Sequence, residues 1–297
     1  MQNSPQTVYL IDASPYIFRA YYSIPPQIKA PDGMQVNAAH GFTDFLFQIL
    51  KKSDATHIAL AFDGSLTTSF RNEIYPDYKA QRESPPEELK RQVEWCVKVA
   101  GVLGIHCFID DKYEADDLIG TFVAQLKDAD GRIIVVSSDK DLSQLVNEKV
   151  ILWDFAKDSW YDIAAVRMKF GVYPEQICDL LGLQGDSVDN IPGVPGIGPK
   201  TAIFLLQEFQ SLDHLYDRID EVAGLALRGA AGIQRKLENS RELAFISRRL
   251  ATIVTDAPVS TTLSELEYKG ADRSAVEALF SHLGFGTLQG RVPRYCI

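Results

Sequence analysis

Three carboxylates are crowded into four positions of the segment YEADDL, residues 113–118. Glu114, Asp116 and Asp117 come immediately before the apolar residues of a predicted helix. Acidic residues suit the first turn of a helix, where unpaired backbone N–H groups leave a partial positive charge, and one or two acids satisfy that preference. Three acids beside an apolar face repel one another, and when partly buried they take up protons or need a cation. Helix capping explains the segment alone slightly better, so the other acids of the chain decide.

More acids follow predicted strands. Asp12, Asp63 and Asp139 each end a β-rich run, and Asp141 comes two residues after Asp139. The carboxyl ends of parallel strands face one crevice. Capping of the next helix explains any one of these aspartates, but it explains three of them beside YEADD poorly. A pair in GDSVDN completes a set of nine acids: Asp12, Asp63, Glu114, Asp116, Asp117, Asp139, Asp141, Asp186 and Asp189.

A cluster of oxygen ligands without His or Cys selects a hard cation such as Mg²⁺ or Mn²⁺. Nine carboxylates exceed the need of one ion that keeps several waters, so we predict two or more ions. Two ions roughly 4 Å apart can activate a water and stabilise the leaving oxygen when a phosphodiester is hydrolysed. The acids therefore predict metal-dependent phosphodiester hydrolysis.

The elements that must position these acids follow a βαβ rhythm. Apolar runs predict strands at 7–13, 56–63, 104–110 and 132–139, with a weaker one at 150–155, and helices at 38–52 and 85–104. Continuous Val, Ile and Leu suits strands that are covered on both faces, as in a parallel sheet. Beyond about residue 175 the pattern becomes helical. We predict an α/β fold, with a mostly parallel central sheet flanked by helices over 1–175 and a helical subdomain with a C-terminal tail over 176–297.

Composition narrows the class of protein. The 297 residues carry a formal net charge of -10, which argues against binding to nucleic acid. When the nine acids are set aside, a charge of about -1 remains, so this objection becomes weak. The four cysteines are widely spaced and form no C-x-x-C motif, which favours a reduced, cytoplasmic compartment. The N-terminus lacks the features of a signal peptide, and no apolar run reaches the roughly 20 residues of a membrane span.

A glycine-rich turn lies in IPGVPGIGPKTA, residues 191–202. It resembles a P-loop at first sight, but Pro199 separates Gly198 from Lys200, whereas that motif needs G-K-[ST]. A helix beginning near Lys200 leaves backbone N–H groups free to meet an anion. A helix-hairpin-helix binds a nucleic-acid phosphate in this way, without reading sequence. The alternative is an ordinary tight turn, but three glycines followed by Lys200 favour phosphate contact.

Two further segments carry basic residues. Segment 69–82 interleaves Arg71, Lys79 and Arg82 with Phe70, Tyr75 and Tyr78. Basic side chains can hold phosphates while aromatic rings stack on unpaired bases. Residues 71–91 hold five basic and five acidic residues, so they form no blanket basic patch. Residues 228–249 hold six Arg and Lys, for which a solvated helix face remains a serious alternative.

Together these motifs resemble the 5'-nuclease family, which comprises the flap endonucleases and the 5'-3' exonuclease domain of bacterial DNA polymerase I. The resemblance covers nearly the whole chain, through YLIDAS, FDG, SFRNEIYPDYKAQR, YEADDLIG, SSDKDLSQL, GDSVDNIPGVPGIGPKTA, RELAFISRRLATI and LFSHLGFGTL. The ordered acids followed by the hairpin are its most specific part.

The resemblance implies a role for each motif. The first metal site would use Asp12, Asp63, Glu114, Asp116 and Asp117, and the second Asp139, Asp141, Asp186 and Asp189. Lys79 and Arg82 would meet the scissile phosphate, on a helical arch region at about 65–92 that covers the threaded strand. The implied catalytic residues are Lys79, Arg82, Asp116 and Asp139, and the implied DNA contacts are Arg71, Tyr78, Lys79, Arg82, Gly193, Gly196, Gly198 and Lys200.

The resulting hypothesis is a 5'-3' exonuclease and flap endonuclease that uses two or more Mg²⁺ or Mn²⁺ ions in DNA replication and repair. Its substrates would be DNA with 5' ends or 5' flaps, and it would act as a monomer, away from membranes, with a DNA polymerase as a candidate partner. The family's hairpin tends to hold a monovalent cation, for which potassium is the candidate here. Two alternatives are a PIN-type ribonuclease, disfavoured by the hairpin and the long helical part, and a silent module for branched nucleic acid, disfavoured by the complete set of acids.

Overall fold

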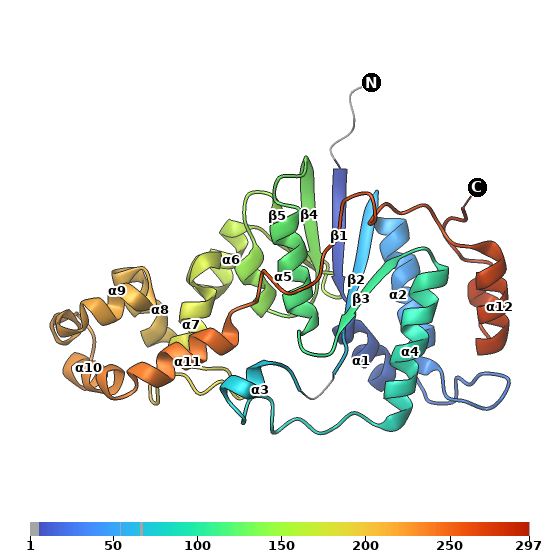
Figure 1. Cartoon of the computed structure of the whole chain (residues 1–297). Coiled ribbons are helices and arrows are strands. Elements are labelled where there is room, and N and C mark those ends of the chain that lie inside the picture. The colour runs from blue at the N-terminus through green and yellow to red at the C-terminus, as the bar shows by residue number, and fades with distance from the viewer. Residues whose placement is uncertain (1–5, 54, 66–67, 297) are drawn as a thin grey trace.

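The computed structural model describes residues 6–53, 55–65 and 68–296. A six-stranded sheet of order β3-β2-β1-β4-β5-β6 lies at the centre (Figure 1). Its strands are β1 (Gln6–Asp12), β2 (His57–Asp63), β3 (His106–Asp110), β4 (Gly131–Val136), β5 (Val150–Asp154) and β6 (Ser159–Tyr161). The predicted parallel sheet is confirmed over its first five strands, whereas β6 is antiparallel to β5. Three residues are too few to show a strand period, so β6 was not predicted.

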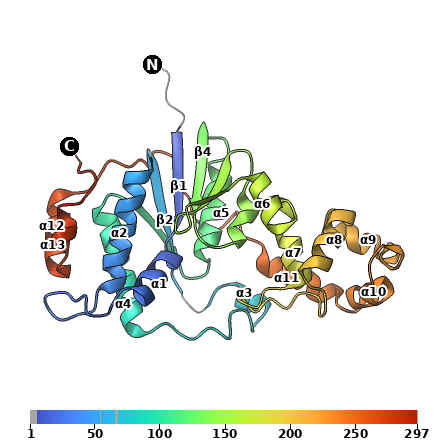
Figure 2. The ribbon, with the colours of Figure 1, turned by 180° about the vertical axis from the view of Figure 1, so that it is seen from behind.

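The two faces of the sheet are covered by different parts of the chain. Along β1, Tyr9 and Ile11 belong to one buried cluster, and Val8 and Leu10 to another, as strand alternation requires. The first cluster is covered by α1 (Ser14–Ser23), α2 (Asn37–Lys52), α4 (Glu87–Val102), α12 (Arg273–Leu283) and α13 (Gly286–Gln289) (Figures 1 and 2). On the opposite face lies α5 (Ala115–Gln125), and the hydrophobic cluster beneath it continues into the helical part.

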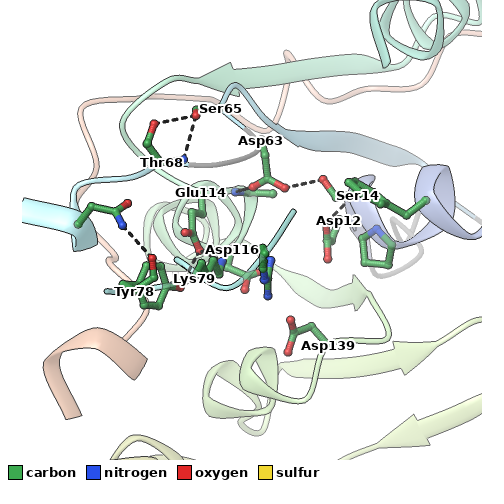
Figure 3. Close-up of a pocket in the computed structure, with 15 residues that line it drawn as sticks. Asp12, Ser14, Asp63, Ser65, Thr68, Tyr78, Lys79, Glu114, Asp116 and Asp139 are labelled. Atoms are coloured by element: carbon green, nitrogen blue, oxygen red, sulfur yellow. Dashed lines mark hydrogen bonds and ion pairs between the residues drawn. The ribbon is translucent and has the colours of Figure 1, made fainter. Parts of the chain in front are cut away.

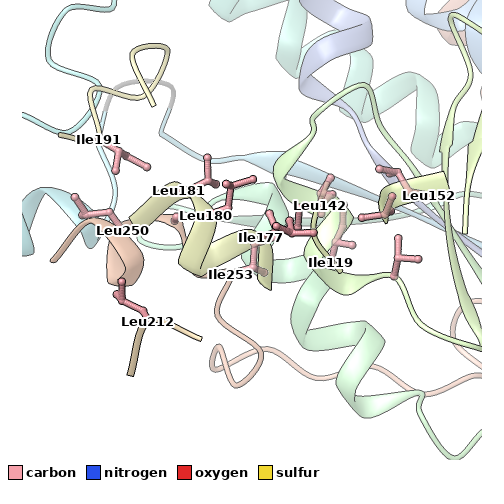
Figure 4. Close-up of a cluster of buried hydrophobic side chains, with 14 of the residues drawn as sticks. Ile119, Leu142, Leu152, Ile177, Leu180, Leu181, Ile191, Leu212, Leu250 and Ile253 are labelled. Carbon is pink, nitrogen blue, oxygen red and sulfur yellow. The ribbon is translucent and has the colours of Figure 1, made fainter. Parts of the chain in front are cut away.

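The helical part extends to one side of the sheet (Figure 1). It comprises α6 (Ile163–Phe170), α7 (Ile177–Gln184), α8 (Pro199–Phe209), α9 (Leu212–Asp217), α10 (Ala230–Asn239) and α11 (Arg241–Ala251), with 3-10 helices η2 (Pro174–Gln176) and η3 (Ile219–Gly224). A further 3-10 helix, η1 (Asp141–Leu145), follows β4. Side chains of the sheet, α5, α7 and α11 share one apolar cluster (Figure 4).

The C-terminal tail returns to the α/β part. The N–H of Ile58 donates to the carbonyl of Leu266, and that of Tyr268 to the carbonyl of Thr56. Helix α12 then lies beside α4 at the end of the molecule remote from the helical part (Figure 1). The tail therefore packs with the sheet and its helices rather than with the helical subdomain.

The segment predicted to arch over the site crosses the carboxyl ends of the strands. It contains α3 (Arg71–Ile74) and then runs without a further helix to α4, along the bottom of the view in Figure 1. Most of the predicted helical arch is therefore not helical, and Pro76, Pro85 and Pro86 disfavour a helix there. Residues 66 and 67 of this segment lie outside the described residues. None of the helices in the described part of the chain is long and apolar enough to cross a membrane.

Candidate active site

Five of the nine predicted acids line one pocket of about 230 Å³ at the carboxyl edge of the sheet. They come from four places in the chain, and their side chains are directed towards a common space (Figure 3). The pocket is also lined by the predicted basic and aromatic residues Tyr78, Lys79 and Arg82. The five acids are Asp12, Asp63, Glu114, Asp116 and Asp139.

Serine hydroxyls hold the acids at the strand ends. Asp12 ends β1 and accepts a hydrogen bond of 2.8 Å from the hydroxyl of Ser137, which follows β4. Asp63 ends β2 and accepts from the hydroxyl of Ser14, at 2.5 Å, and from the N–H of Ala115, at 2.9 Å. These bonds join the end of β1 to the residue after β4, and the end of β2 to the starts of α1 and α5. Sequence reasoning missed both serines, although each stands within two residues of a predicted acid in "IDAS" and "SSD".

The crowded segment YEADDL serves both purposes weighed for it. Glu114 is the N-cap of α5 and forms a capping box with Asp117, so two of the three acids stabilise the start of the helix. Asp116 lies between them, and its side chain enters the pocket (Figure 3). Glu114 therefore serves both the helix cap and the pocket, Asp116 the pocket, and Asp117 the cap.

Burial and like charges raise the pKa of several of these carboxyls. Burial is the largest cause of the strongly raised pKa of Asp12, to which the charge of Asp63 adds, and of the strongly raised pKa of Asp116, to which the charge of Asp139 adds. Glu114 differs, because the cations of Lys79 and Arg71 outweigh its burial and lower its pKa. The pocket thus holds carboxyls whose pKa is raised beside one whose pKa is lowered.

Two further predicted acids, Asp186 and Asp189, are paired with basic side chains. The ammonium of Lys140 is 2.6 Å from Asp186, and Asp189 pairs with Arg82 and, at 3.7 Å, with Lys79. The loop at 186–190 also contacts the arch segment, because the carbonyl of Asp189 accepts from the N–H of Lys79. Sequence reasoning missed Lys140, which stands between two predicted acids in "SDKD".

Asp141 is the least satisfied of these acids. Its Oδ1 is buried and has no hydrogen-bond partner within the described part of the chain. Burial, together with the charge of Asp139, raises the pKa of Asp141 to about 8. A buried carboxylate oxygen without a donor is costly unless a proton or a cation satisfies it.

The donor set fits a hard cation, although the side chains do not form a ready-made metal site. In the described residues, no group of three or more His, Cys, Asp and Glu side chains is arranged to hold a metal ion as it stands. Lys79, Arg82 and Lys140 pair with the carboxylates instead. The oxygen-only donors, the repulsion among crowded carboxylates and the unsatisfied Asp141 oxygen nevertheless fit a cation such as Mg²⁺ or Mn²⁺, which prefers ionised carboxylate ligands.

Two predicted site residues lie elsewhere. Arg71 was expected to contact DNA, but its side chain is buried and pairs with Asp117 through two hydrogen bonds of 2.8 Å. Asp117 was expected to bind an ion, but it is fully buried and does not line the pocket. A guanidinium at the centre of a salt bridge cannot meet a phosphate, so the placement of Arg71 differs from the prediction.

The glycine turn stands at the start of α8, as predicted. Gly193 and Gly196 have φ of +62° and +80°, which favours glycine, and Gly198 is the N-cap with Pro199 after it. A Cβ on Gly193 would lie 2.2 Å from the backbone N of Gly185, so the turn packs tightly against the end of α7. The carbonyl of Gly196 accepts from the ammonium of Lys236, at 3.2 Å.

The raised pKa values predict how metal-free stability depends on pH. A carboxyl whose pKa is higher in the folded than in the unfolded state stabilises the fold at low pH. That stabilisation is lost as the pH rises from about 4 towards the folded-state pKa, which is about 8 for Asp141. In EDTA we expect the melting temperature to fall by about 5 °C from pH 6 to pH 8.5, as for a loss of about 2 kcal/mol. Asp141→Asn should flatten this slope. A melting temperature that rises over this range would contradict the prediction.

Comparison with known proteins places this site in a family. Residues 7–171 match the model of the 5'-3' exonuclease N-terminal resolvase-like domain, and residues 172–274 match the 5'-3' exonuclease C-terminal SAM fold. DNA polymerase I of Bacillus subtilis is 40% identical over 288 residues, covering 95% of this chain and 32% of the relative. DNA polymerase I of Pseudomonas aeruginosa is 39% identical over 277 residues, covering 93% and 30%. The chain thus spans about a third of the length of these curated relatives.

Solved structures share the fold at lower identity. The T5 D15 protein co-crystallised with metal ions has a TM-score of 0.68 at 23% identity, covering 84% of this chain and 90% of that one. The catalytic core of Rad2 in complex with DNA has a TM-score of 0.63 at 17% identity, covering 95% and 88%. Because the two family models together match most of the chain, the protein belongs to the 5'-3' exonuclease family.

Proposed function

We propose that the protein is a divalent-metal-dependent 5'-3' exonuclease and structure-specific flap endonuclease that hydrolyses phosphodiester bonds of DNA. The observation that carries this proposal is the convergence of five acids with Lys79 and Arg82 in one pocket. The acids attract cations, whereas the basic groups attract phosphate. A phosphodiester with bound metal ions can interact with both, because its ions bind the acids and its phosphate binds the basic groups. The metal-bound T5 protein and the DNA-bound Rad2 core support the same assignment.

We assign the acids to two ion sites. Asp12, Asp63, Glu114 and Asp116 would hold the first, and Asp139, Asp141, Asp186 and Asp189 the second. Bound ions would supply an activated water and neutralise charge on the phosphate and the leaving oxygen. Mg²⁺ or Mn²⁺ suits oxygen ligands of this kind.

Lys79 and Arg82 would bind and orient the scissile phosphate. Both are paired with carboxylates in the structure, and Lys79 lies 2.7 Å from Glu114. A phosphate that enters the pocket can replace these carboxylates as the partner of the two basic groups. Tyr78 borders the same space, and its hydroxyl lies 3.2 Å from Glu114 and 3.3 Å from Asp189, which fixes its buried ring at the edge of the pocket.

A 5'-labelled flap incubated with Mg²⁺ and with EDTA tests this function. We expect cleavage at the junction in Mg²⁺, no cleavage in EDTA, and binding without cleavage in Ca²⁺. Undiminished cutting in EDTA would refute the metal requirement. A matched RNA flap that is cut faster than the DNA would favour the ribonuclease alternative, and binding without cutting in every metal would favour the silent module.

The partners follow from the same proposal. The curated relatives are named DNA polymerase I, so we propose a DNA polymerase as the working partner and replication and repair as the setting. All four cysteines are free, which agrees with a reduced, cytoplasmic location. We propose that the protein binds DNA as a monomer.

We propose that the turn at 193–200 holds duplex DNA through backbone N–H groups at the start of α8, with Lys200 beside it. Potassium is the candidate for a cation at the turn. The Lys236 ammonium already contacts the Gly196 carbonyl, so a potassium ion there would share or replace that contact.

Gly198 allows a clean test of this turn. A Cβ at Gly198 meets no atom within 4 Å, whereas one at Gly196 would lie 2.5 Å from Nζ of Lys236 and would carry a φ of +80°. We expect Gly198→Leu to weaken duplex binding roughly fivefold, as for the loss of about 1 kcal/mol, because the side chain covers the N–H groups. Fluorescence anisotropy measures it.

Gly286→Leu on α13 is the matched control, because a Cβ there also meets no atom within 4 Å and α13 lies at the other end of the molecule (Figure 2). Equal affinities of the folded Gly198 variant and the wild type would refute the role of the turn.

A further inference from the structure

A buried guanidinium joins three parts of the chain. Arg71 begins α3, at the base of the arch segment, and only 3% of its side-chain surface is exposed. Its two terminal nitrogens donate to the two oxygens of Asp117, at 2.8 Å each. Its Nε donates to the carbonyl of Leu250, at 2.8 Å, and one terminal nitrogen to the carbonyl of Thr252, at 3.0 Å. Arg71 therefore ties α3 to the start of α5 and to the end of α11.

Asp117 has no room for a further partner. One oxygen accepts from Arg71 and from the N–H of Val254, and the other accepts from Arg71 and from the N–H of Glu114. Each oxygen thus has two donors, which is the usual capacity of a carboxylate oxygen. The side chain is fully buried. An ion could bind Asp117 only by breaking these bonds.

The pair also reaches the pocket. Arg71 lies 3.8 Å from the oxygen of Glu114 that pairs with Lys79 at 2.7 Å, so one carboxylate oxygen connects the two basic groups. The guanidinium carbon is 5.9 Å from the ring centre of Tyr78, the residue before Lys79. Displacement of Arg71 would therefore move Glu114, Tyr78 and Lys79 together.

We propose that Arg71 and Asp117 are positioning residues, which hold the arch segment against α5 so that Lys79 and Glu114 face the reacting phosphate, and that Asp117 is not a metal ligand. The role in cleavage rests on the proposed nuclease function, whereas the holding of the arch does not. Either residue without the other leaves a buried, unpaired charge, which is strongly destabilising. An apolar pair of similar size can replace a buried ion pair with little loss.

A double-mutant cycle tests this proposal with Arg71→Met, Asp117→Leu and the double variant. In EDTA we expect each single variant to melt about 10 °C lower than the wild type and the double variant to recover most of that loss. Trypsin should cut after Lys79 and Arg82 roughly tenfold faster in the single variants, because the arch is released. The double variant should regain much of the protection. If the losses of melting temperature in the two single variants add in the double variant, the proposal that Arg71 and Asp117 act as a pair is wrong.

The rate of flap cleavage at different Mg²⁺ concentrations distinguishes a positioning role from metal binding. We expect each single variant to cut a 5' flap 10- to 100-fold more slowly than the wild type, even at saturating Mg²⁺, and the double variant to recover most of that loss. A rise in the half-saturating Mg²⁺ concentration that comes from displacement of Glu114 should likewise be relieved in the double variant. Asp116→Asn should instead require more Mg²⁺ without loss of stability in EDTA. A raised Mg²⁺ requirement in Asp117→Leu that the double variant does not relieve would show Asp117 to be a ligand.

Two controls complete the design. Leu288→Ala on α13 removes a buried side chain far from the arch, and it should lower the melting temperature without slowing cleavage. If the Arg71 and Asp117 single variants also melt lower without slower cleavage, the pair is only structural. Asp117→Asn keeps the shape of the side chain and serves if a single variant fails to fold. If the wild type cuts no flap, the nuclease proposal fails, while melting and proteolysis still test whether Arg71 and Asp117 act as a pair.

Discussion

Asp186→Asn is expected to lower the single-turnover rate of flap cleavage about 10³-fold, while flap affinity holds or tightens. Asp186 follows α7, and its carboxylate is almost completely buried and lies 2.6 Å from the ammonium of Lys140. Asparagine keeps the shape but removes one negative charge from the second proposed ion site. That loss weakens attraction for the ion and also relieves repulsion against DNA phosphates. Several kcal/mol is the scale on which a bound metal stabilises transition-state charge.

A local role for Asp186 makes a different prediction. Its Oδ1 accepts from the N–H of Val188, at 2.9 Å, and such a turn is worth about 1 kcal/mol of stability. Flap affinity in Ca²⁺, cleavage rate in Mg²⁺ and melting temperature together separate the two. Asp154→Asn is the matched control, because Asp154 is also buried, pairs with Lys157 at 2.9 Å and is not one of the acids assigned to the ion sites. A variant that melts lower but cuts normally would make Asp186 structural.

Loss of the Lys79 ammonium is expected to slow turnover by about 10²- to 10³-fold and to weaken flap binding by less than tenfold. A cation held at the scissile phosphate acts most strongly on the charge that develops in the transition state. Lys79 is held firmly, since its N–H donates to the carbonyl of Asp189 at 3.0 Å and its ammonium lies 2.7 Å from Glu114.

The backbone at Lys79 determines which substitutions test this. Its φ is +55°, a conformation that strains alanine but not glycine. Lys79→Gly and Lys79→Ala both remove the ammonium, so equal losses of single-turnover rate would assign the effect to charge and not to strain. Binding and turnover that fall by the same factor in both variants would reduce Lys79 to a general phosphate contact.

The sequence predicted the parts of the site that depend on local pattern and topology. Asp12, Asp63 and Asp139 stand at or just after the ends of β1, β2 and β4, and parallel pairing of those strands brings them to one edge. The parallel sheet itself followed from unbroken apolar runs between predicted helices.

Long-range pairing could not be predicted in this way. Arg71 and Asp117 are 46 residues apart, and neither neighbourhood indicates that the other residue is its partner. The segment YEADDL offers three equivalent acids, and only the packing of α5 decides that Asp116 enters the pocket while Asp117 is buried. The return of the tail to α4 likewise depends on contacts that no local period shows.

The shared apolar cluster joins residues 7–171 and residues 172–274, the two regions that match family models, into one thermodynamic unit. The cluster runs without interruption from Leu152 in the sheet, through Ile177 and Leu181 on α7, to Leu250 at the end of α11 (Figure 4). Neither region alone can bury its share of this surface, so we expect the wild type to unfold in one cooperative transition with equal calorimetric and van't Hoff enthalpies. Exchange of one region between relatives would then succeed only when the apolar residues on both sides of the junction are exchanged with it.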